Sequence, residues 1–432
     1  MVTGLYSIKR RRIKMEKTYD QTKGFHILAK PTGPICNLDC HYCFYTEKEA
    51  FFSGKSRFKM SDETLEEFIQ QYIKAQDVNE IPFVWQGGEP TLMGLDFYKR
   101  VIELQKKYGK GKKIINSLQT NGTLLTEEWC QFLKEHNFLV GLSLDGPENI
   151  HNRYRVDRGG EPTFQKVQKG LRLLKKYKVA FNVLVCVTKF SSMYPLEIYH
   201  FLKKEGIEFI QFIPIVERMP DMEAKKLGLR HATPPVVKQE EAQKAVSSWT
   251  VESEKYGDFL IAIFEEWVRN DVGKVHVMNF EHALTSWLGL PATSCIFAET
   301  CGRAAIVEHN GDVYSCDHFM YPDYRLGNIF DDTFVEMIES NQQKAFGENK
   351  KSTLPKYCQT CEVRFACNGE CPKHRFLLTP DGEPGLNYLC AGYKKYFNHI
   401  HRYMKVMVQL IQNGVPASEV MEVIKRPLII NG

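Results

Sequence analysis

The sequence Ile35-Cys-Asn-Leu-Asp-Cys-His-Tyr-Cys-Phe-Tyr45 contains three closely spaced cysteines. Cys36, Cys40 and Cys43 have the spacing C-x3-C-x2-C and follow a short apolar run. Three thiolates can bind three irons of a [4Fe–4S] cubane, which normally takes four ligands, so one iron is left open. A zinc site needs a fourth ligand, and His41 lies too close in sequence to the cysteines to supply it comfortably. The spacing therefore favours an iron–sulfur cluster over zinc and over inert thiols.

Around this cysteine loop, short apolar runs alternate with amphipathic segments of helical period. The apolar runs predict buried parallel strands and are 25–29, 81–85, 114–118, 139–144, 180–187 and 209–216. The predicted helices between them are 61–76, 95–108, 126–136, 163–177 and 192–205, four of them with candidate N-caps at Ser61, Thr126, Thr163 and Ser192. Such a βα repeat is either an open doubly wound sheet or a partial barrel. Its functional residues should lie in the loops after the strands.

A second signal follows the second predicted strand, in Trp85-Gln-Gly-Gly-Glu-Pro90. Paired glycines allow the backbone to approach a ligand closely, and Glu89 offers an acceptor for an amino group. Gly-Gly is also common in ordinary strand-to-helix turns. Together with the cysteine spacing, however, this sequence resembles the radical S-adenosylmethionine (radical SAM) superfamily. The resemblance implies a partial (β/α)6 barrel, an open-iron cluster that binds SAM, and SAM contacts from Phe44, Gly87, Gly88, Glu89, Gln119, Asn121, Ser143 and Arg155.

Two of these predicted contacts are specific. Ser143 and Arg155 resemble the positions that hold the ribose and the carboxylate of SAM in that superfamily. For both residues, a simple turn or surface position is an equally good explanation of the sequence.

The C-terminal half holds a second block of eight cysteines: Cys295, Cys301, Cys316, Cys358, Cys361, Cys367, Cys371 and Cys390. Eight thiolates suffice for two fully ligated [4Fe–4S] clusters, and two zinc sites are the alternative. The loop-rich sequence around them has few apolar runs, so bound metal is expected to stabilise it. Cys130 and Cys186 are left over, and a free thiol in a helix or strand is usually a small buried hydrophobe.

The spacing of the second block resembles the SPASM domain, a twin-cluster extension of some radical SAM enzymes. By that resemblance, the cluster nearer the active site is held by Cys295, Cys301, Cys316 and Cys371. The outer cluster is held by Cys358, Cys361, Cys367 and Cys390. The expected domains are a tail at 1–22, the barrel at 23–225, a linker with helices at 226–290, the SPASM domain at 291–392 and a helical tail at 393–432.

The sequence Cys316-Asp317 narrows the resemblance further, to the anaerobic sulfatase-maturating enzymes. In that family a SAM-derived radical takes a hydrogen atom from Cβ of a Cys or Ser in a sulfatase, and the product is formylglycine. The resemblance implies that Asp317 is the general base, where turn capping is the alternative role. It also implies that Tyr45 and Gln86 line the peptide site. His318 and His374 have no assigned role.

Composition excludes several other classes. Apolar residues make up 43% and charged residues 25% of the 432 residues, so the chain is globular. The net charge of +5 is too small to indicate a nucleic-acid partner, and no apolar stretch is long enough to span a membrane. The expected partners are a sulfatase polypeptide and an electron donor such as flavodoxin or ferredoxin, in an anaerobic cytoplasm. The alternatives are a SPASM enzyme that crosslinks a ribosomal peptide and a non-catalytic iron–sulfur or zinc protein.

Overall fold

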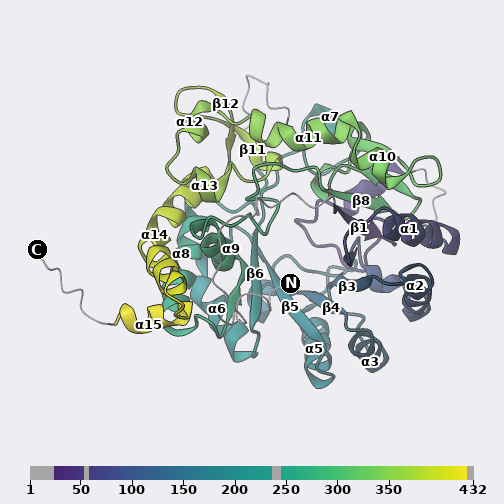
Figure 1. Cartoon of the computed structure of the whole chain (residues 1–432), viewed down its shortest axis with the longest axis horizontal. Helices are drawn as coiled ribbons and strands as arrows, with labels where there is room; N and C mark the ends of the chain where they lie inside the picture. The colour runs from purple at the N-terminus through teal and green to yellow at the C-terminus, as the bar shows by residue number, and fades with distance from the viewer. Residues whose placement is uncertain (1–23, 53–57, 236–244, 426–432) are drawn as a thin grey trace, which may run out of the picture.

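A ten-stranded mixed sheet organises the chain in the computed structural model, which describes residues 24–52, 58–235 and 245–425 (Figure 1). The strand order is β10-β9-β8-β1-β2-β3-β4-β5-β6-β7. Strands β1 to β7 run parallel to their neighbours, and β8 pairs parallel with β1. Only the pairs β8–β9 and β9–β10 are antiparallel. The expected tail at 1–22 lies outside the described residues.

The predicted βα repeat is present, with its strands in sequential order. The six strands are β1 (His26–Lys30), β2 (Glu80–Trp85), β3 (Lys113–Thr120), β4 (Leu139–Ser143), β5 (Ala180–Val187) and β6 (Phe209–Pro214). The helices between them are α1 (Asp62–Lys74), α2 (Leu95–Tyr108), α3 (Glu127–Glu135), α4 (Glu148–His151), α5 (Phe164–Lys176) and α6 (Pro195–Lys204). This order is that of a partial barrel, which confirms the predicted fold class.

Three of the four predicted N-cap residues stand at the N-cap position, two of them with a side-chain capping bond, and the fourth is wrong. The Ser61 and Thr126 hydroxyls accept hydrogen bonds from the backbone N–H groups of Thr64 and Trp129. Thr163 makes no capping bond, because its hydroxyl donates instead to the carbonyl of Arg155 at 2.7 Å. Ser192 lies in the short 3-10 helix η3 (Ser191–Met193), and α6 begins only at Pro195.

The sheet extends beyond the six strands on both sides. β7 (His276–Val277) adds to β6, while β8 (Ala304–Glu308), β9 (Asp312–Tyr314) and β10 (Arg325–Asn328) extend from β1. The remaining strands, β11 (Arg375–Leu378) and β12 (Pro384–Asn387), form a separate hairpin. The sheet therefore runs without a break from the barrel into the cysteine-rich C-terminal part.

Additional helices surround these strands. The longer ones are α8 (Ser253–Asn270), α9 (Met278–Trp287), α11 (Asn341–Ser352) and α14 (Cys390–Gln412). The short ones are α7 (Met222–Lys226), α10 (Phe334–Ile338), α12 (Lys356–Gln359), α13 (Arg364–Cys367) and α15 (Val420–Val423). The 3-10 turns are η1 (Thr46–Phe51), η2 (Pro90–Met93), η4 (Asp317–Phe319), η5 (Pro322–Tyr324), η6 (Pro372–His374) and η7 (Ala417–Glu419). The apolar pattern did not predict α10 and α11.

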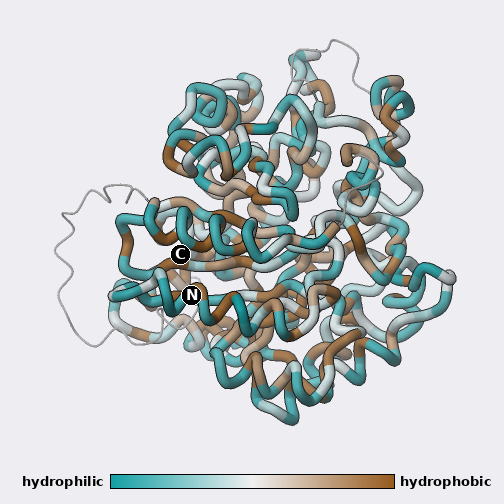
Figure 2. Tube along the Cα trace, turned by 90° about the vertical axis from the view of Figure 1, so that its right-hand side faces the viewer, coloured by the Kyte–Doolittle hydropathy of each residue, from teal (hydrophilic) through white to brown (hydrophobic). Residues whose placement is uncertain are grey.

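One large hydrophobic core connects the barrel, α8, α9 and α14. Figure 2 shows hydrophobic and hydrophilic residues alternating along the helices, as expected for helices with one buried face. Helices α8 and α14 come so close that a Cβ on Gly392 would meet the backbone of Ser253, and one on Gly257 would meet Gly392. Glycine at these two positions permits the close packing of the C-terminal helix.

Across the described ranges, no helix combines the length and the apolarity needed to cross a membrane.

Candidate active site

The predicted ligand-binding residues meet at the C-terminal ends of the parallel strands. The cysteine loop follows β1, the two glycines follow β2, Asn121 follows β3 and Asp145 follows β4. Because parallel strands end at one edge of a sheet, these loops lie together there. The edge is thus the candidate active site.

Several hydrogen bonds fix the cysteine loop at this edge. The N–H of Cys43 donates to the carbonyl of Cys40 at 2.9 Å, and the N–H of Leu38 lies 3.3 Å from Sγ of Cys36. The Asn121 amide donates to the same sulfur at 3.8 Å. The pKa of Cys36 is raised to about 12, first by burial and then by the nearby Glu89 and Cys43. Burial also raises the pKa of Cys40. Ionised thiolates here therefore need a positive partner such as iron.

The Gly-Gly-Glu-Pro loop packs against the backbone of the cysteine loop. Gly88 N–H donates to the carbonyl of Gly33 at 2.8 Å, and Glu89 N–H donates to that of Ile35 at 2.9 Å. A Cβ on Gly88 would collide with the Ile35 carbonyl, and Gly87 has φ of +146°. The paired glycines are therefore required by the contact between these two loops.

The carboxylate of Glu89 is engaged within the protein. It accepts hydrogen bonds from the backbone and hydroxyl of Thr91, the hydroxyl of Thr120 and the backbone of Asn121, at 2.6–3.0 Å. Only 1% of Glu89 is exposed, and burial raises its pKa despite these donors. Its contact with a ligand amino group stays a prediction. Oε1 accepts from three of these donors, while Oε2 accepts only from Asn121 within the described residues.

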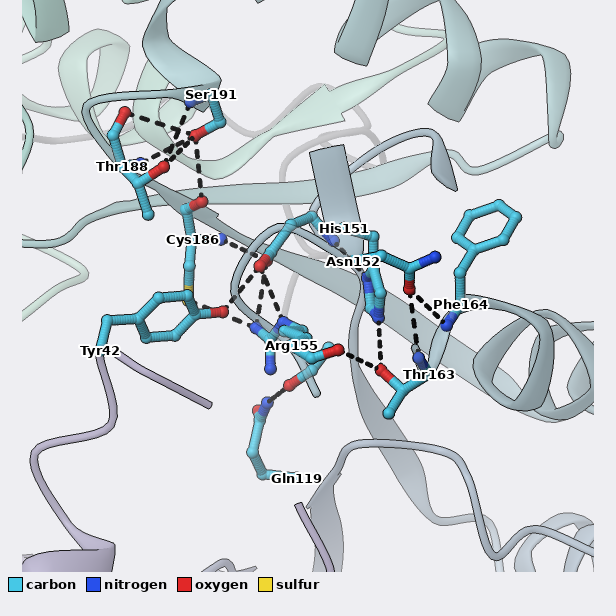
Figure 3. Close-up of polar contacts among 12 residues, drawn as sticks. Tyr42, Gln119, His151, Asn152, Arg155, Thr163, Phe164, Cys186, Thr188 and Ser191 are labelled. Atoms are coloured by element: carbon cyan, nitrogen blue, oxygen red, sulfur yellow. Dashed lines mark hydrogen bonds and ion pairs between the residues drawn. The ribbon is translucent and has the colours of Figure 1, made fainter. Parts of the chain in front are cut away.

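The next strand ends bring together the other predicted contacts (Figure 3). The Gln119 amide donates to the hydroxyl of Ser143 at 3.3 Å, from β3 to β4. Arg155 is 7% exposed and forms a bidentate ion pair with Asp145, at 2.8 and 3.1 Å. Arg155 is thus a buried part of this edge and not a surface residue.

Asp317 is the first residue of η4, which follows β9. Its Oδ1 is paired with Nζ of Lys30, the last residue of β1. Burial raises the pKa of Asp317, but the attraction of Lys30, His318 and Lys373 outweighs burial and leaves the pKa below its ordinary value. Within the described residues Oδ2 accepts no hydrogen bond, and the side chain is 23% exposed. Asp317 is therefore an ionised carboxylate with one oxygen held and the other available.

Lys30 also connects Asp317 to Tyr45. The ammonium lies 3.9 Å from the centre of the Tyr45 ring, and the Tyr45 hydroxyl donates to Glu308 at 2.6 Å. Tyr45 is only 3% exposed. Its predicted contact with a substrate stays a prediction, since its hydroxyl already has a partner in the protein.

Phe44 lies between the cysteine loop and the C-terminal part of the chain. Its ring meets that of His318 edge-on at 5.3 Å, and the ammonium of Lys373 lies 4.2 Å from its centre. Lys373 in turn forms an ion pair with Glu217 at 2.5 Å. Among the residues in the described ranges, the side chain of Gln86 makes no hydrogen bond.

Comparison with known proteins agrees with this geometry. Residues 31–202 match the family model of the radical SAM superfamily, and residues 295–362 match that of an iron-sulfur cluster-binding domain, SPASM. A serine-type anaerobic sulfatase-maturating enzyme from Bacteroides thetaiotaomicron is 46% identical over 93% of this chain and 96% of its own length. A cysteine-type enzyme from Clostridium perfringens is 36% identical over 86% of this chain and 95% of its own.

The chain belongs to the anaerobic sulfatase-maturating enzyme family.

Solved structures of this family have the same architecture. The structure of anSMEcpe with bound AdoMet and the Cp18Cys peptide has 35% sequence identity and a TM-score of 0.77, covering 89% of this chain and 99% of that chain. Streptococcus suis SuiB bound to its precursor peptide SuiA has 13% identity and a TM-score of 0.57, covering 85% of this chain and 76% of that chain. The second likeness shows a shared fold alone.

As in other sulfatase-maturating enzymes of this family, the residues must accommodate three [4Fe–4S] clusters and SAM. All thirteen cysteines lie in described ranges and are free of disulfides. No three His, Cys, Asp or Glu side chains in those ranges converge as they would around a single metal ion. Four cysteines line one partly open hollow, namely Cys358, Cys361, Cys367 and Cys390. These are the four residues predicted for the outer cluster.

The predicted inner set is also brought together. Burial is the main cause of the raised pKa of Cys316 and Cys371, and the charge of Cys295 adds to it in both. Burial also raises the pKa of Cys301, and the charge of Cys295 adds to this rise. Cys295 thus lies near enough to Cys301, Cys316 and Cys371 for their charges to interact. Four thiolates suit a [4Fe–4S] cluster, and the assignment of these four to one cluster stays a prediction.

The remaining cysteines are outside these groups. Cys130 is fully buried, as predicted. Cys186 is only half-buried, and its sulfur lies 3.4 Å from Nη2 of Arg155, so it is not simply a buried hydrophobe. The two unassigned histidines lie near the inner set: Nδ1 of His318 is 3.5 Å from Sγ of Cys371, and His374 bonds Glu370 at 2.8 Å.

Four residues of the site were not predicted from the sequence: Lys30, Tyr42, Asp145 and Lys373. Lys30 carried a signal, because a charged residue that ends a buried apolar strand is rare without a partner. Asp145 stood within the Ser-Leu-Asp-Gly-Pro sequence that was attributed to Ser143 alone. The partners of both come from distant parts of the sequence, which periodicity does not reveal.

Proposed function

We propose that this chain oxidises the side chain of a Cys or Ser in a sulfatase polypeptide to formylglycine. Two findings support the proposal: membership of the sulfatase-maturating family, and the likeness to a relative solved with AdoMet and a peptide. The observation that carries it is the state of Asp317, with Oδ1 paired to Lys30 and Oδ2 without a partner in the described part of the chain. A carboxylate so placed beside Cys316 is suited to accept a proton.

Asp317 takes the proton of the reacting thiol or hydroxyl in this proposal. When bound, SAM and the clusters supply a radical that removes the Cβ hydrogen atom and an acceptor for one further electron. With the hydrogen atom, the electron and the proton removed, a Ser side chain becomes an aldehyde and a Cys side chain a thioaldehyde. Water hydrolyses the thioaldehyde to the aldehyde and releases hydrogen sulfide. The lowered pKa keeps Asp317 ionised and ready for its step.

The loops at the strand ends hold the cofactors. Cys36, Cys40 and Cys43 bind the open-iron cluster. Arg155 and Ser143 contact the carboxylate and ribose of SAM, and the other contacts come from Phe44, Gly87, Gly88, Glu89, Gln119 and Asn121. Tyr45 and Gln86 line the peptide path towards Asp317. The packing of Lys373 on Phe44 joins the cysteine loop to the C-terminal part.

The proposal extends to the setting of the reaction. A small reducing protein such as flavodoxin or ferredoxin donates electrons, and the enzyme works in an anaerobic cytoplasm. No nucleic acid takes part. We keep the domain boundaries proposed from the sequence, at 225, 290 and 392. They mark changes in sequence composition, since strands β7 to β10, which come after residue 225, belong to the same sheet as the barrel strands.

The test is anaerobic incubation of the reconstituted chain with SAM, dithionite and a sulfatase-motif peptide, followed by mass spectrometry. Peptides with Cys, Ser or Ala at the target position are compared. We expect a mass decrease at the Cys or Ser position and no oxidised product from the Ala peptide. A crosslink within the peptide would favour a peptide-crosslinking enzyme instead, and an absence of SAM cleavage would contradict both functions.

A further inference from the structure

Tyr42 lies inside the first cysteine sequence, between Cys40 and Cys43, but its hydroxyl points away to another element. It donates to Oδ2 of Asp145 at 2.6 Å (Figure 3). Tyr42 is 5% exposed and Asp145 is 4% exposed. A hydrogen bond to an ionised carboxylate in such a buried place is short and strong.

Asp145 joins three separate segments of the chain. Besides Tyr42, its carboxylate accepts from Nε and Nη2 of Arg155 and from the backbone N–H of Cys186 at 2.8 Å. Burial raises the pKa of Asp145, but Arg155 outweighs burial and lowers it, so the group is a carboxylate. The Asp145 carboxylate therefore joins the cysteine loop, the segment after β4 and strand β5 by hydrogen bonds.

The same contacts fix the direction of Arg155. Two of its three guanidinium nitrogens bind Asp145, and Nη1 has no hydrogen-bond partner among the residues that the structure describes. Its backbone carbonyl accepts from Thr163, whose hydroxyl lies 3.2 Å from Nε2 of His151. Nδ1 of His151 accepts from the N–H of Asp145, so Nε2 carries the proton. This chain of bonds leaves one face of Arg155 available for an anionic ligand.

We propose that Tyr42 and Asp145 are positioning residues that align Arg155 with the cysteine loop, so that the SAM carboxylate is bound in register with the cluster. The inference rests on the proposed function and assigns to Tyr42 a role separate from metal ligation. Tyr42 acts through Asp145, since no bond joins its hydroxyl to Arg155. Its loss should weaken binding of the carboxylate while the three iron ligands remain.

The test compares Tyr42→Phe with Tyr154→Phe in the full, anaerobically reconstituted chain. Tyr154 packs edge-on against Tyr42 at 6.2 Å, and within the described residues its hydroxyl makes no hydrogen bond. Equilibrium dialysis measures the affinity for SAM and for decarboxylated SAM. We expect Tyr42→Phe to bind SAM roughly tenfold more weakly, the loss typical of one hydrogen bond to a charged group. Iron content and the affinity for decarboxylated SAM should match those of wild type, and Tyr154→Phe should behave as wild type throughout.

The outcomes separate the inference from the proposed function. Unchanged SAM affinity in Tyr42→Phe, or an equal loss for SAM and decarboxylated SAM, would overturn the positioning role. Asp145→Asn provides a second variant. Its affinity for SAM should fall towards its affinity for decarboxylated SAM. A preference for SAM as large as that of wild type would overturn the role of Asp145. Failure of the wild-type chain to bind SAM would instead overturn the proposed function.

Discussion

Lys30 and Asp317 form an ion pair between the end of β1 and the start of η4, two positions that are 287 residues apart in the chain. Lys30 is 1% exposed, and its ammonium also lies over the ring of Tyr45. The pair joins the barrel to the C-terminal cysteine-rich part at the place where the base is proposed. Its charge is the main one that favours the ionised form of Asp317.

Replacing Lys30 should therefore impair the proton-transfer step. In Lys30→Met we expect formylglycine formation to fall about 10- to 100-fold, because the carboxylate loses both its position and its countercharge. SAM cleavage should fall much less. Mass spectrometry of the peptide, with deoxyadenosine measured in the same samples, gives both values. Lys30→Arg is the matched control and should recover part of the activity; a Lys30→Met variant as active as wild type would contradict this role.

Removing the proposed base should separate SAM cleavage from formylglycine formation. In Asp317→Asn we expect SAM cleavage to continue and formylglycine to decrease by ~10²-fold or more, since the amide cannot accept the proton. The ratio of deoxyadenosine to formylglycine measures the separation. The control is Asp323→Asn, an exposed residue of η5 in the same region, which should leave the ratio unchanged. Normal formylglycine yield in Asp317→Asn would remove Asp317 from the mechanism.

Iron content tests the three cysteine groups. The reconstituted chain should hold about 12 irons, since each of three cubanes contains four. Cys40→Ala should lose about a third of this iron and all SAM cleavage, because the open-iron cluster has only three ligands. Cys130→Ala is the control, as this buried thiol belongs to no group, and its iron should be unchanged. An iron content near four in the wild-type chain would contradict the prediction.

Acid should destabilise the buried His151. Burial lowers its pKa from 6.5 to about 3, while the neighbouring Asp145 partly opposes the shift. Between pH 6.5 and about 3 the unfolded chain binds one more proton here than the folded chain does. Stability is therefore lost as the pH falls, by about 1.4 kcal/mol per pH unit within this window.

Thermal unfolding at pH 7 and pH 5 measures this effect. The wild-type midpoint should fall more between the two pH values than that of His151→Gln, whose side chain does not titrate. His136→Gln, at the half-buried end of α3, is the control and should follow wild type. Equal losses in wild type and His151→Gln would show that this histidine does not contribute.

The parallel part of the fold was predictable because its signals are local. Strand β5 and helix α2 begin and end at the predicted residues, since apolar period and length are properties of the segment itself. Helix α11 was missed because its sequence is polar along its length and it starts at a Ser340 cap without an apolar stripe. Thr163 stands at the N-cap of α5 without a capping bond because its hydroxyl donates to the Arg155 carbonyl. Ser192 lies before α6, and its hydroxyl donates to the nearby Lys189 carbonyl.

The sequence predicted the candidate metal and cofactor ligands of the site better than the residues that position them. Cysteine spacing and the two glycines are short-range patterns. The four cysteines predicted for the outer cluster line one hollow, and the assignment of both sets to clusters stays a prediction. The roles of Lys30 and Tyr42 depend on carboxylates that are distant in sequence. Glu89 shows the same limit. Its carboxylate accepts four hydrogen bonds from Thr91, Thr120 and Asn121, and the last two residues are distant in sequence.

The parallel pairing of β1 with β8 has a consequence for biosynthesis. His26 lies opposite Ala304. One edge of β1 therefore lacks its partner strand until most of the polypeptide has left the ribosome. Contacts between such distant segments form slowly, and Asp317 cannot reach Lys30 before they do. A nascent chain would therefore have an incomplete active site. We expect the iron–sulfur clusters to be inserted after the whole chain has been synthesised.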